Sequence, residues 1–445
     1  MKKLLILAYD FPPYVSVGGL RPYSWYKYMH EFGIFPVVVT RQWSNKYGNH
    51  LDYIAPGESN DVIIEESEKG IIIRAPYKPT LANRLMLRYG ENRFKFLRKI
   101  ITGWYEFVQW FLPVGTKYSI YKAAKEFLKT NKVDCIIATG EPFILFKYAL
   151  KLGKKTKIPI IIDYRDLWSY SLSRNKNIFF KNLNIRFELR ILKSCLLVSA
   201  VSEFLLEKIK DVYKINNSIV ITNGYDEELL TDHKNIVITD PSKLILTFVG
   251  SIYAWHPLRS VLSVLKEFKV FCESLDIKFE LHFYGTNKNK EIVEYCSDNI
   301  LVLNENIYLH SKLKNDILFK EMLKTDLLLL FNDFLISGTK IYDYLATKKK
   351  IILCYDSDRF GDIMSGPYGN KVGIEEYANL QKNIILETTS GIIVTDPEDL
   401  FKNLKALLKE KIENGVIKSE TTNIEKYSRR YQTSLLAKKI LGLIQ

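Results

Sequence analysis

The sequence predicts an α/β fold with two parallel sheets, one in each half of the chain. Short apolar runs of strand length alternate with longer stretches of helical periodicity, as is typical of parallel sheets covered by helices. The length of 445 residues, with 47% hydrophobic and 26% charged residues, is enough for two folded domains. A polar segment over 226–243 separates two series of strand-like runs. We therefore expect an N-terminal domain over 1–230 and a C-terminal domain over 240–424.

The expected strands share a run of apolar residues bounded by polar or turn residues. Those of the first domain cover 3–8, 35–40, 135–139, 158–163, 196–201 and 218–222. Those of the second domain cover 244–249, 279–284, 307–309, 327–331, 351–354 and 391–394. The first run is not interpreted as a signal peptide, because Asp10-Phe11-Pro12-Pro13 interrupts it too early. No apolar run reaches the roughly 20 residues that span a bilayer.

The net charge of +14 admits nucleic acid, an anionic membrane surface or phosphorylated small molecules as partners. No nucleic-acid-binding motif accompanies the charge, so nucleic acid is disfavoured. Basic residues gather over 84–99, followed by an apolar stripe at helical spacing up to residue 111. Such an amphipathic element suits either an anionic membrane, contacted through residues 84–111, or packing into the protein core. Both alternatives remain open.

Five cysteines are scattered without a CxxC pair or the spacing of metal ligands. This pattern favours buried thiols in a reducing compartment and argues against a zinc site.

The first strand is followed by a glycine pair that opens a helical pattern. Gly18 and Gly19 precede Trp25 and Tyr28 at helical spacing, and Arg21 lies in the first turn. Helix N-termini at the carboxyl edge of a parallel sheet bind anions in open α/β folds. The pair is not a GxGxxG sequence, so a dinucleotide site is disfavoured.

The segment 337–346 combines a flexible backbone, a cation and a carboxylate at an expected helix start. Gly338 permits close approach of a ligand, Thr339 is a candidate N-cap and Lys340 adds a positive charge. Asp343 lies on the same helical face and offers a carboxylate to ribose hydroxyls. The segment therefore predicts a site for the phosphates of a nucleotide sugar, with an ordinary capped helix as the alternative.

Several segments, in this order, resemble glycosyltransferase family 4 enzymes of the GT-B fold. The similarity is greatest to bacterial members that build surface polysaccharides, whose version of the segment at Asp163 is similar to DFRDPW. The segments that carry the resemblance are Phe11-Pro12-Pro13 with Gly18-Gly19, Asp163-Tyr164-Arg165-Asp166-Leu167-Trp168, Ser202-Glu203, Asn223-Gly224-Tyr225-Asp226, Phe248-Val249-Gly250-Ser251, Tyr284-Gly285 and Gly338 to Ala346.

The resemblance implies two Rossmann-like domains with parallel sheets facing a central cleft. It also implies an acceptor bound by the N-terminal domain, a nucleotide sugar bound by the C-terminal domain, retention of anomeric configuration and no required metal or other cofactor. The closing helix, at about 425–445, is expected to pack back on the first domain. The residues expected to bind the donor are Gly18, Gly19, Asn223, Gly250, Ser251, Arg259, Gly285, Gly338, Thr339, Lys340 and Asp343.

The chain departs from the family pattern at two positions. Many members carry two glutamates eight positions apart; here Asp343 matches the second and Leu335 stands at the first. The familiar arginine after the glycine at 250 is Ser251 in this chain. Lys340 and Arg259 are therefore our candidates for neutralising the diphosphate, with an exposed helix cation as the alternative for Arg259.

The polar cluster at 163–168 follows an expected buried strand and should line the edge of the sheet. We expect Arg165 and Asp166, together with Lys340, to act in catalysis, with Asp166 as a candidate proton acceptor. A salt bridge that shapes the loop is the alternative for Arg165 and Asp166. The residues expected to contact the acceptor are Arg21, Glu141, Asp163 and Trp168.

The sequence thus predicts a retaining glycosyltransferase that uses a nucleotide-sugar donor and a glycan or polyprenyl-diphosphate-linked acceptor. We expect it in the cytoplasm, peripheral on the inner face of the cell membrane. Two alternatives remain: a nucleotide-sugar 2-epimerase of the same fold, and a non-catalytic scaffold that binds sugar nucleotides.

Overall fold

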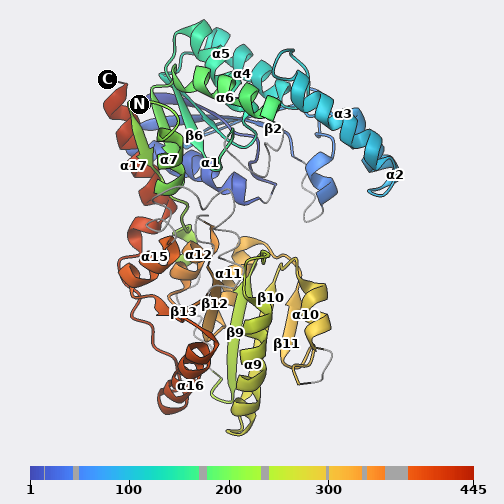
Figure 1. Ribbon diagram of the computed structural model, residues 1–445. Coiled ribbons are helices and arrows are strands. Elements are labelled where there is room, and N and C mark those ends of the chain that lie inside the picture. Colours follow the sequence, from blue (N-terminus) through green and yellow to red (C-terminus); the bar gives the residue numbers. More distant parts are fainter. Residues whose placement is uncertain are drawn as a thin grey trace. The chain divides into compact units, whose positions relative to one another are not determined.

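The structure is a computed structural model, and it describes residues 1–14, 16–43, 50–169, 178–231, 240–296, 300–332, 338–355 and 379–444. The chain divides into two compact units. Unit 1 comprises Met1–Thr222 with Arg430–Gln445, and unit 2 comprises Asn223–Arg429. Each unit is an α/β layer structure with one sheet between helices (Figure 1).

Unit 1 contains an eight-stranded sheet in the order β3-β4-β2-β1-β5-β6-β7-β8. All neighbouring strands are parallel except β3 and β4. The strands are β1 (Lys2–Leu7), β2 (Ile34–Arg41), β3 (Ile63–Ser67), β4 (Gly70–Ala75), β5 (Cys135–Thr139), β6 (Ile160–Tyr164), β7 (Leu197–Ala200) and β8 (Ser218–Val220). The six strands expected in this half of the chain are all present, whereas the β3–β4 hairpin was not predicted.

Two apolar cores cover the two faces of the sheet in unit 1. Successive residues of β1 alternate between them, with Leu5 in one core and Leu4 in the other, as the two-residue period of a strand requires. Leu436 and Ile440 of the last helix pack in the same core as Leu4. The helices of unit 1 are α1 (Val17–Tyr28), η1 (Met29–Phe32), η2 (His50–Ile54), α2 (Leu81–Tyr89), α3 (Lys95–Val108), α4 (Tyr118–Thr130), α5 (Ile144–Thr156), α6 (Ile178–Leu192), α7 (Glu203–Lys210) and α17 (Arg429–Leu443).

Unit 2 contains a six-stranded parallel sheet in the order β11-β10-β9-β12-β13-β14. The strands are β9 (Lys243–Val249), β10 (Lys278–Tyr284), β11 (Ile307–His310), β12 (Leu327–Phe331), β13 (Lys350–Cys354) and β14 (Gly391–Ile393). Every strand expected in this half of the chain is present. Its helices are α8 (Glu228–Thr231), α9 (Leu258–Glu273), α10 (Asn289–Tyr295), α11 (Asn315–Leu323), α12 (Lys340–Thr347), α15 (Leu380–Thr388), α16 (Pro397–Asn414) and η4 (Glu425–Tyr427).

The helices of unit 2 bury apolar faces on both sides of its sheet. Leu262 of α9 and Leu404 of α16 belong to the core on one face. Phe319 of α11, Leu345 of α12 and Ile385 of α15 belong to the core on the other face. Across the described ranges of both units, no helix has the combination of length and apolar character needed to cross a bilayer.

Candidate functional site

Each sheet has one point at which the chain reverses the order in which it adds strands. In unit 1 this topological switch point lies between β1 and β5, and in unit 2 it lies between β9 and β12. Open α/β sheets bind ligands outside the carboxyl ends of the strands at such a point, because the connecting loops there run in opposite directions and leave a crevice. The topology therefore gives two candidate ligand sites, one in each unit.

In unit 2 the strands β9 and β12 separate before they end. They pair only through Leu246 and Thr247 on the β9 side. Beyond that point the amide of Val249 donates to the hydroxyl oxygen of Tyr344, 2.9 Å away. The same hydroxyl donates to the carbonyl of Leu329 at 3.2 Å. The fully buried Tyr344 therefore fixes α12 against both central strands, and it places the helix N-terminus at the switch point.

Lys340 lies at this N-terminus and reaches the loop after β9. Its Nζ donates to the carbonyl of Ser251 at 2.7 Å and lies 4.8 Å from the centre of the Phe248 ring. A Cβ atom added to Gly250 would lie 2.9 Å from Cε of Lys340, and Gly250 has φ +89°. Glycine is therefore favoured at 250 by its backbone conformation, and a side chain there would displace the lysine stem above it. Lys340 supplies a cation next to Ser251, the position at which the family arginine is missing.

The backbone around α12 matches the expected phosphate site in position but not in every detail. The helix begins after Thr339 as predicted, but the Thr339 side chain makes no capping hydrogen bond. The expectation of a side-chain N-cap is therefore wrong, because Thr339 has helical rather than extended dihedral angles. Gly338 directly precedes this turn. Ser337 and Leu335 lie outside the described residues.

Asp343 lies one turn along α12 from Lys340. The pKa of its carboxyl is raised to about 6, mainly by burial, while the charge of Arg429 lowers it and the charge of Asp226 raises it. The carboxyl is therefore close to the Asn223–Asp226 segment and to Arg429, the first residue of α17. Gly224 in this segment is packed closely, since an added Cβ would lie 3.0 Å from the amide nitrogen of Arg429. Asn223, next to it, is partly exposed.

Two further donor candidates, Gly285 and Arg259, also lie in unit 2. Gly285 follows β10 with φ +65°, and its amide donates to the carbonyl of His310 at 3.0 Å. Arg259 lies in the first turn of α9, where 71% of its side chain is exposed and Nε lies 3.2 Å from Oε1 of Glu291. The exposed ion pair agrees with the alternative stated for Arg259, a cation on the helix surface.

In unit 1 the glycine pair opens α1 as expected, but its amides already have partners. The amide of Gly18 donates to Oγ of Ser16 at 3.0 Å, and the amide of Gly19 donates to the Ser16 carbonyl at 3.0 Å. Ser16 in turn donates to Oδ2 of Asp10 at 2.7 Å. The expectation that these two amides are available to a phosphate therefore does not hold in this arrangement. These backbone amides instead form hydrogen bonds within their own loop.

Arg165 connects three loops at the carboxyl edge of unit 1. Its guanidinium donates to the carbonyls of Gly18 at 2.5 Å, of Glu141 at 2.7 Å and of Gly140. Burial lowers the pKa of Arg165. With all three nitrogens engaged by backbone carbonyls, Arg165 is placed to hold loops in position and not to contact a reacting atom.

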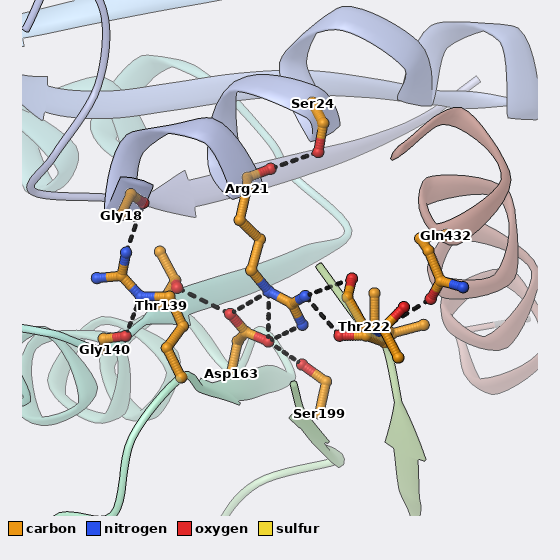
Figure 2. A network of polar contacts seen from close by, with 11 residues as sticks. Gly18, Arg21, Ser24, Thr139, Gly140, Asp163, Ser199, Thr222 and Gln432 are labelled. Atoms are coloured by element: carbon orange, nitrogen blue, oxygen red, sulfur yellow. Dashed lines mark hydrogen bonds and ion pairs between the residues drawn. The ribbon is translucent and has the colours of Figure 1, made fainter. Parts of the chain in front are cut away.

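Arg21 and Asp163 do not face solvent, contrary to their expected role with the acceptor (Figure 2). They form a buried ion pair with Nη2 and Oδ1 2.7 Å apart. Asp163 also accepts hydrogen bonds from Thr139 at 2.8 Å and from Ser199 at 2.5 Å. Because Asp163 is 0% exposed and both of its oxygens are bonded, this pair organises the edge of the sheet and is not open to an acceptor.

Trp168 also lies in the interior. It stacks on Trp110 and Phe143, with ring centres 5.0 and 5.4 Å apart, and is 5% exposed. The expected contact between Trp168 and the acceptor is therefore wrong for this arrangement, because the side chain is buried against other aromatic rings. Asp166 is exposed on the same loop, and desolvation by its surroundings raises the pKa of its carboxyl. Glu141 is partly exposed on the loop after β5.

Asp10 and Tyr344 are residues of interest that the sequence did not single out. Asp10 follows β1 at the switch point of unit 1, and burial raises the pKa of its carboxyl. Its Oδ1 is buried and has no hydrogen-bond partner among the described residues. The position of Asp10, three residues after the end of the first strand, was a usable signal. Nothing in the sequence indicated the contacts of Tyr344, which depend on where β9 and β12 separate.

Comparison with solved structures defines the class of fold. Sucrose-phosphate synthase from Thermosynechococcus elongatus is 13% identical, with a TM-score of 0.57 over 100% of this chain and 95% of that chain. Anabaena HepE, solved in complex with UDP, is 11% identical, with a TM-score of 0.52 over 99% and 100%. WaaG, described as a glycosyltransferase involved in lipopolysaccharide biosynthesis, is 12% identical, with a TM-score of 0.53 over 99% and 100%. The chain has the GT-B fold of these glycosyltransferases.

Comparison with protein families is more specific for a segment that covers part of unit 1 and the first residues of unit 2. Residues 87–229 match Glycosyltransferase Family 4. The chain therefore contains a glycosyltransferase family 4 domain, which agrees with the resemblance noted from the sequence. No curated protein matches the chain.

Proposed function

We propose that this protein is a retaining glycosyltransferase that moves a sugar from a nucleotide-diphosphate sugar to a hydroxyl of a glycan or lipid-linked glycan. The observation that carries the proposal is the position of Lys340. Its ammonium group lies at the N-terminus of α12 and at the switch point of a parallel sheet, 2.7 Å from the Ser251 carbonyl. A cation and a helix N-terminus at one point favour a ligand with concentrated negative charge, such as a diphosphate.

In the proposed reaction Lys340 and the amides near Gly338 stabilise the negative charge that develops on the departing nucleoside diphosphate. The loop at Gly250 and Ser251 approaches the phosphates closely because residue 250 has no side chain. Asp343 accepts a hydrogen bond from a ribose hydroxyl when it is ionised. The acceptor hydroxyl attacks from the face that the nucleotide leaves, so the anomeric configuration is retained. This scheme assigns charge neutralisation to protein groups and requires no metal or other cofactor.

For unit 1 we propose that the exposed Asp166 receives the acceptor and that Arg165 positions the loop that carries it. A raised pKa suits a carboxylate that accepts a proton in the course of the reaction. Glu141 lies on a neighbouring loop at the same sheet edge, and its carbonyl is bonded to Arg165. These contacts support a shared acceptor region, in which the two buried groups, Arg21 and Asp163, serve as the supporting framework.

We further propose that the reaction belongs to the synthesis of a bacterial surface polysaccharide such as capsule or O-antigen, at the inner face of the cell membrane. The likeness to WaaG, which is described as acting in lipopolysaccharide biosynthesis, supports this setting. HepE was solved with UDP bound, which makes UDP-sugars the first donors to test.

The donor site can be tested with the purified chain and a thermal-shift screen of UDP-, GDP- and dTDP-sugars. We expect one donor class to raise the melting temperature of the unaltered protein, and Lys340→Ala to abolish most of this rise and severely reduce turnover. Lys348→Ala is the matched control, because it removes an exposed lysine from the other end of the same helix. Normal turnover in Lys340→Ala would remove Lys340 from the diphosphate site.

The type of reaction is tested by supplying the identified donor with and without acceptor glycans. Transfer with a product of unchanged anomeric configuration supports the proposal. Conversion of the donor sugar without any acceptor would instead identify a 2-epimerase. Donor binding with no turnover across the acceptor screen would identify a scaffold.

A further inference from the structure

Residues 81–112 form an arm that contains the helices α2 and α3, and Trp110 at its base packs against one core of unit 1. Figure 1 shows α2 and α3 extending from the body of this unit. None of the 14 residues of α3 is buried, whereas α5 buries a full face against the sheet. The alternative in which the apolar stripe of this segment packs into the protein core is therefore wrong for α3. Its apolar side chains are therefore available to bind another molecule or surface.

The exposed apolar side chains of the arm are large, and those that belong to α3 share one face of that helix. Phe96 is 79% exposed, Ile100 is 53% exposed and Trp104 is 54% exposed. At about 100° per residue, the apolar positions of α3 cover an arc of about 140°. Lys95 and Lys99 lie on the opposite face. Soluble proteins seldom leave a contiguous apolar patch of this kind uncovered. The large apolar residues exposed in the arm are Leu81, Leu87, Tyr89, Phe94, Phe96, Leu97, Ile100, Trp104, Phe107, Phe111 and Leu112.

The charge of the arm indicates what covers this face. The arm contains six basic residues and two glutamates. One of the glutamates, Glu106, is paired with Lys117, with Nζ and Oε1 2.5 Å apart. A helix with large apolar residues on one side and cations on the other is suited to the interface of a bilayer that contains anionic lipids. A second copy of the chain suits it less well, because a symmetric interface would bring two basic arms together.

The base of the arm is attached to the loop that carries the acceptor candidates. The Trp110 ring stacks on Trp168 and Phe187, with ring centres 5.0 and 4.9 Å away. Lys147 donates to the carbonyl of Gln109 at 3.1 Å and also to that of Trp110. Trp168 lies two residues after Asp166 in the segment that follows β6. The arm and this loop are therefore joined through one packed aromatic contact.

We propose that the arm binds an anionic lipid bilayer, with the apolar face of α3 inserted at the level of the acyl-chain boundary and the basic residues among the headgroups. This inference deepens the proposed function by naming the surface at which the enzyme meets a lipid-linked acceptor. It rests on the proposed function only for the acceptor, since lipid binding is measured without turnover.

The test uses co-sedimentation of the full chain with phosphatidylcholine vesicles that either contain or lack phosphatidylglycerol. We expect binding to the anionic vesicles, and about tenfold weaker binding by the triple variant Phe96→Ser, Ile100→Ser, Trp104→Ser. The matched control is Val270→Ser, Leu275→Ser, Leu386→Ser, because these side chains are 54%, 44% and 61% exposed in unit 2. The control should bind the vesicles as the unaltered chain does. Circular dichroism before sedimentation confirms that each variant is folded.

A second variant tests the charged face and leaves the apolar face unchanged. Arg88→Gln, Lys95→Gln, Lys99→Gln should remove most of the preference for anionic vesicles, and added salt should do the same to the unaltered chain. Lys129→Gln, Lys409→Gln is the control, with side chains 59% and 77% exposed outside the arm.

The inference is overturned if the unaltered chain does not bind anionic vesicles, or if the apolar arm variant sediments with these vesicles as well as the control does. It is also overturned if the arm variants bind vesicles normally but have a lower molar mass than the unaltered chain in light scattering without lipid. That result would show that the apolar face of the arm binds a second copy of the chain. Transfer to a water-soluble acceptor should survive the arm substitutions. If the unaltered chain also fails to transfer sugar to a water-soluble acceptor, the result counts against the proposed function and not against lipid binding.

Discussion

Arg21 and Asp163 form an ion pair inside unit 1, with Nη2 and Oδ1 2.7 Å apart and side chains that are 4% and 0% exposed. The pair joins the first helix to the end of β6, across 142 residues of sequence. The guanidinium also donates to the carbonyls of Ile221 and Thr222, where the chain leaves unit 1. One buried charge cluster therefore fixes the switch-point helix, a central strand and the end of the first chain segment of this unit.

Replacing Arg21 with Met should destabilise unit 1 by about 3–5 kcal/mol, because it leaves the Asp163 carboxylate buried without its cation. Tryptophan fluorescence during urea unfolding measures the effect. Five of the six tryptophans belong to unit 1, and only Trp255 belongs to unit 2, so the signal reports mainly on the affected unit.

The control for this loss is Glu126→Gln, which removes an ion pair with Lys129 whose side chains are 59% and 52% exposed. Exposed pairs contribute about 0–1 kcal/mol, so the control should unfold almost as the unaltered chain does. Equal unfolding midpoints for Arg21→Met and the control would show that the buried pair has no stabilising role.

Most strands were predictable because they are central and buried on both faces. Runs such as Leu4–Leu7 are continuous apolar sequence, since a helix covers each side of the sheet. The β3–β4 hairpin was missed because β3 is an edge strand whose residues are mostly exposed, with two glutamates in its five positions. An exposed edge strand lacks the apolar run by which the others were recognised.

It was possible to predict which site residues lie at the carboxyl edge of a sheet, but not which residues they contact there. The sequence placed Arg21 and Asp163 at the carboxyl edge, yet their pairing depends on the strand order that brings α1 next to β6. The stripe over 94–111 shows the same limit. Its period establishes that one face of the helix is apolar, and only the three-dimensional packing shows that the protein does not cover that face.

Replacing Gly250 with Ala should weaken donor binding by about tenfold, which corresponds to about 1.4 kcal/mol. The added Cβ would lie 2.9 Å from Cε of Lys340, and the flexible lysine stem would move away from its position over the loop. The backbone strain at φ +89° should also cost roughly 1 kcal/mol of stability. Titration calorimetry with the donor found in the thermal-shift screen measures the binding effect.

Gly415→Ala is the control variant, because it introduces a similar backbone strain without displacing Lys340. Gly415 has φ +73°, and an added Cβ there meets no atom within 4 Å. This variant should lose similar stability and keep its donor affinity. If both variants bound donor equally well, the contact between residue 250 and Lys340 would have no part in the site.

Replacing Arg259 with Ala should change donor affinity by less than about threefold, whereas Lys340→Ala should lose far more. Arg259 is largely exposed and paired with Glu291, and the interaction between charges in water is weak. Calorimetry on both variants under the same salt conditions makes the comparison. If Arg259→Ala lost as much donor affinity as Lys340→Ala does, Arg259 would have to bind the diphosphate together with Lys340.

The stability of unit 2 should depend on pH through Asp343, whose pKa is raised from 3.8 to about 6 mainly by burial. Below about pH 3.8 the carboxyl is protonated in both states and has no effect. Between about 3.8 and 6 the unfolded chain releases the proton and the folded chain keeps it, so the free energy of unfolding falls as pH rises. Above about 6 both states are ionised, and the loss stays constant at roughly 3 kcal/mol.

Asp343→Asn removes this titration and should be more stable than the unaltered chain at neutral pH. Its advantage in urea unfolding, followed by circular dichroism, should be about 1–1.5 kcal/mol larger at pH 7.5 than at pH 5. Asp240→Asn is the control, because hydrogen bonds from Ser242 lower the pKa of Asp240, so its effect on stability should not change between pH 5 and pH 7.5. An advantage of Asp343→Asn that did not change with pH would show that the Asp343 carboxyl titrates normally, and that the residue is less desolvated than its position against Arg429 and Asp226 indicates.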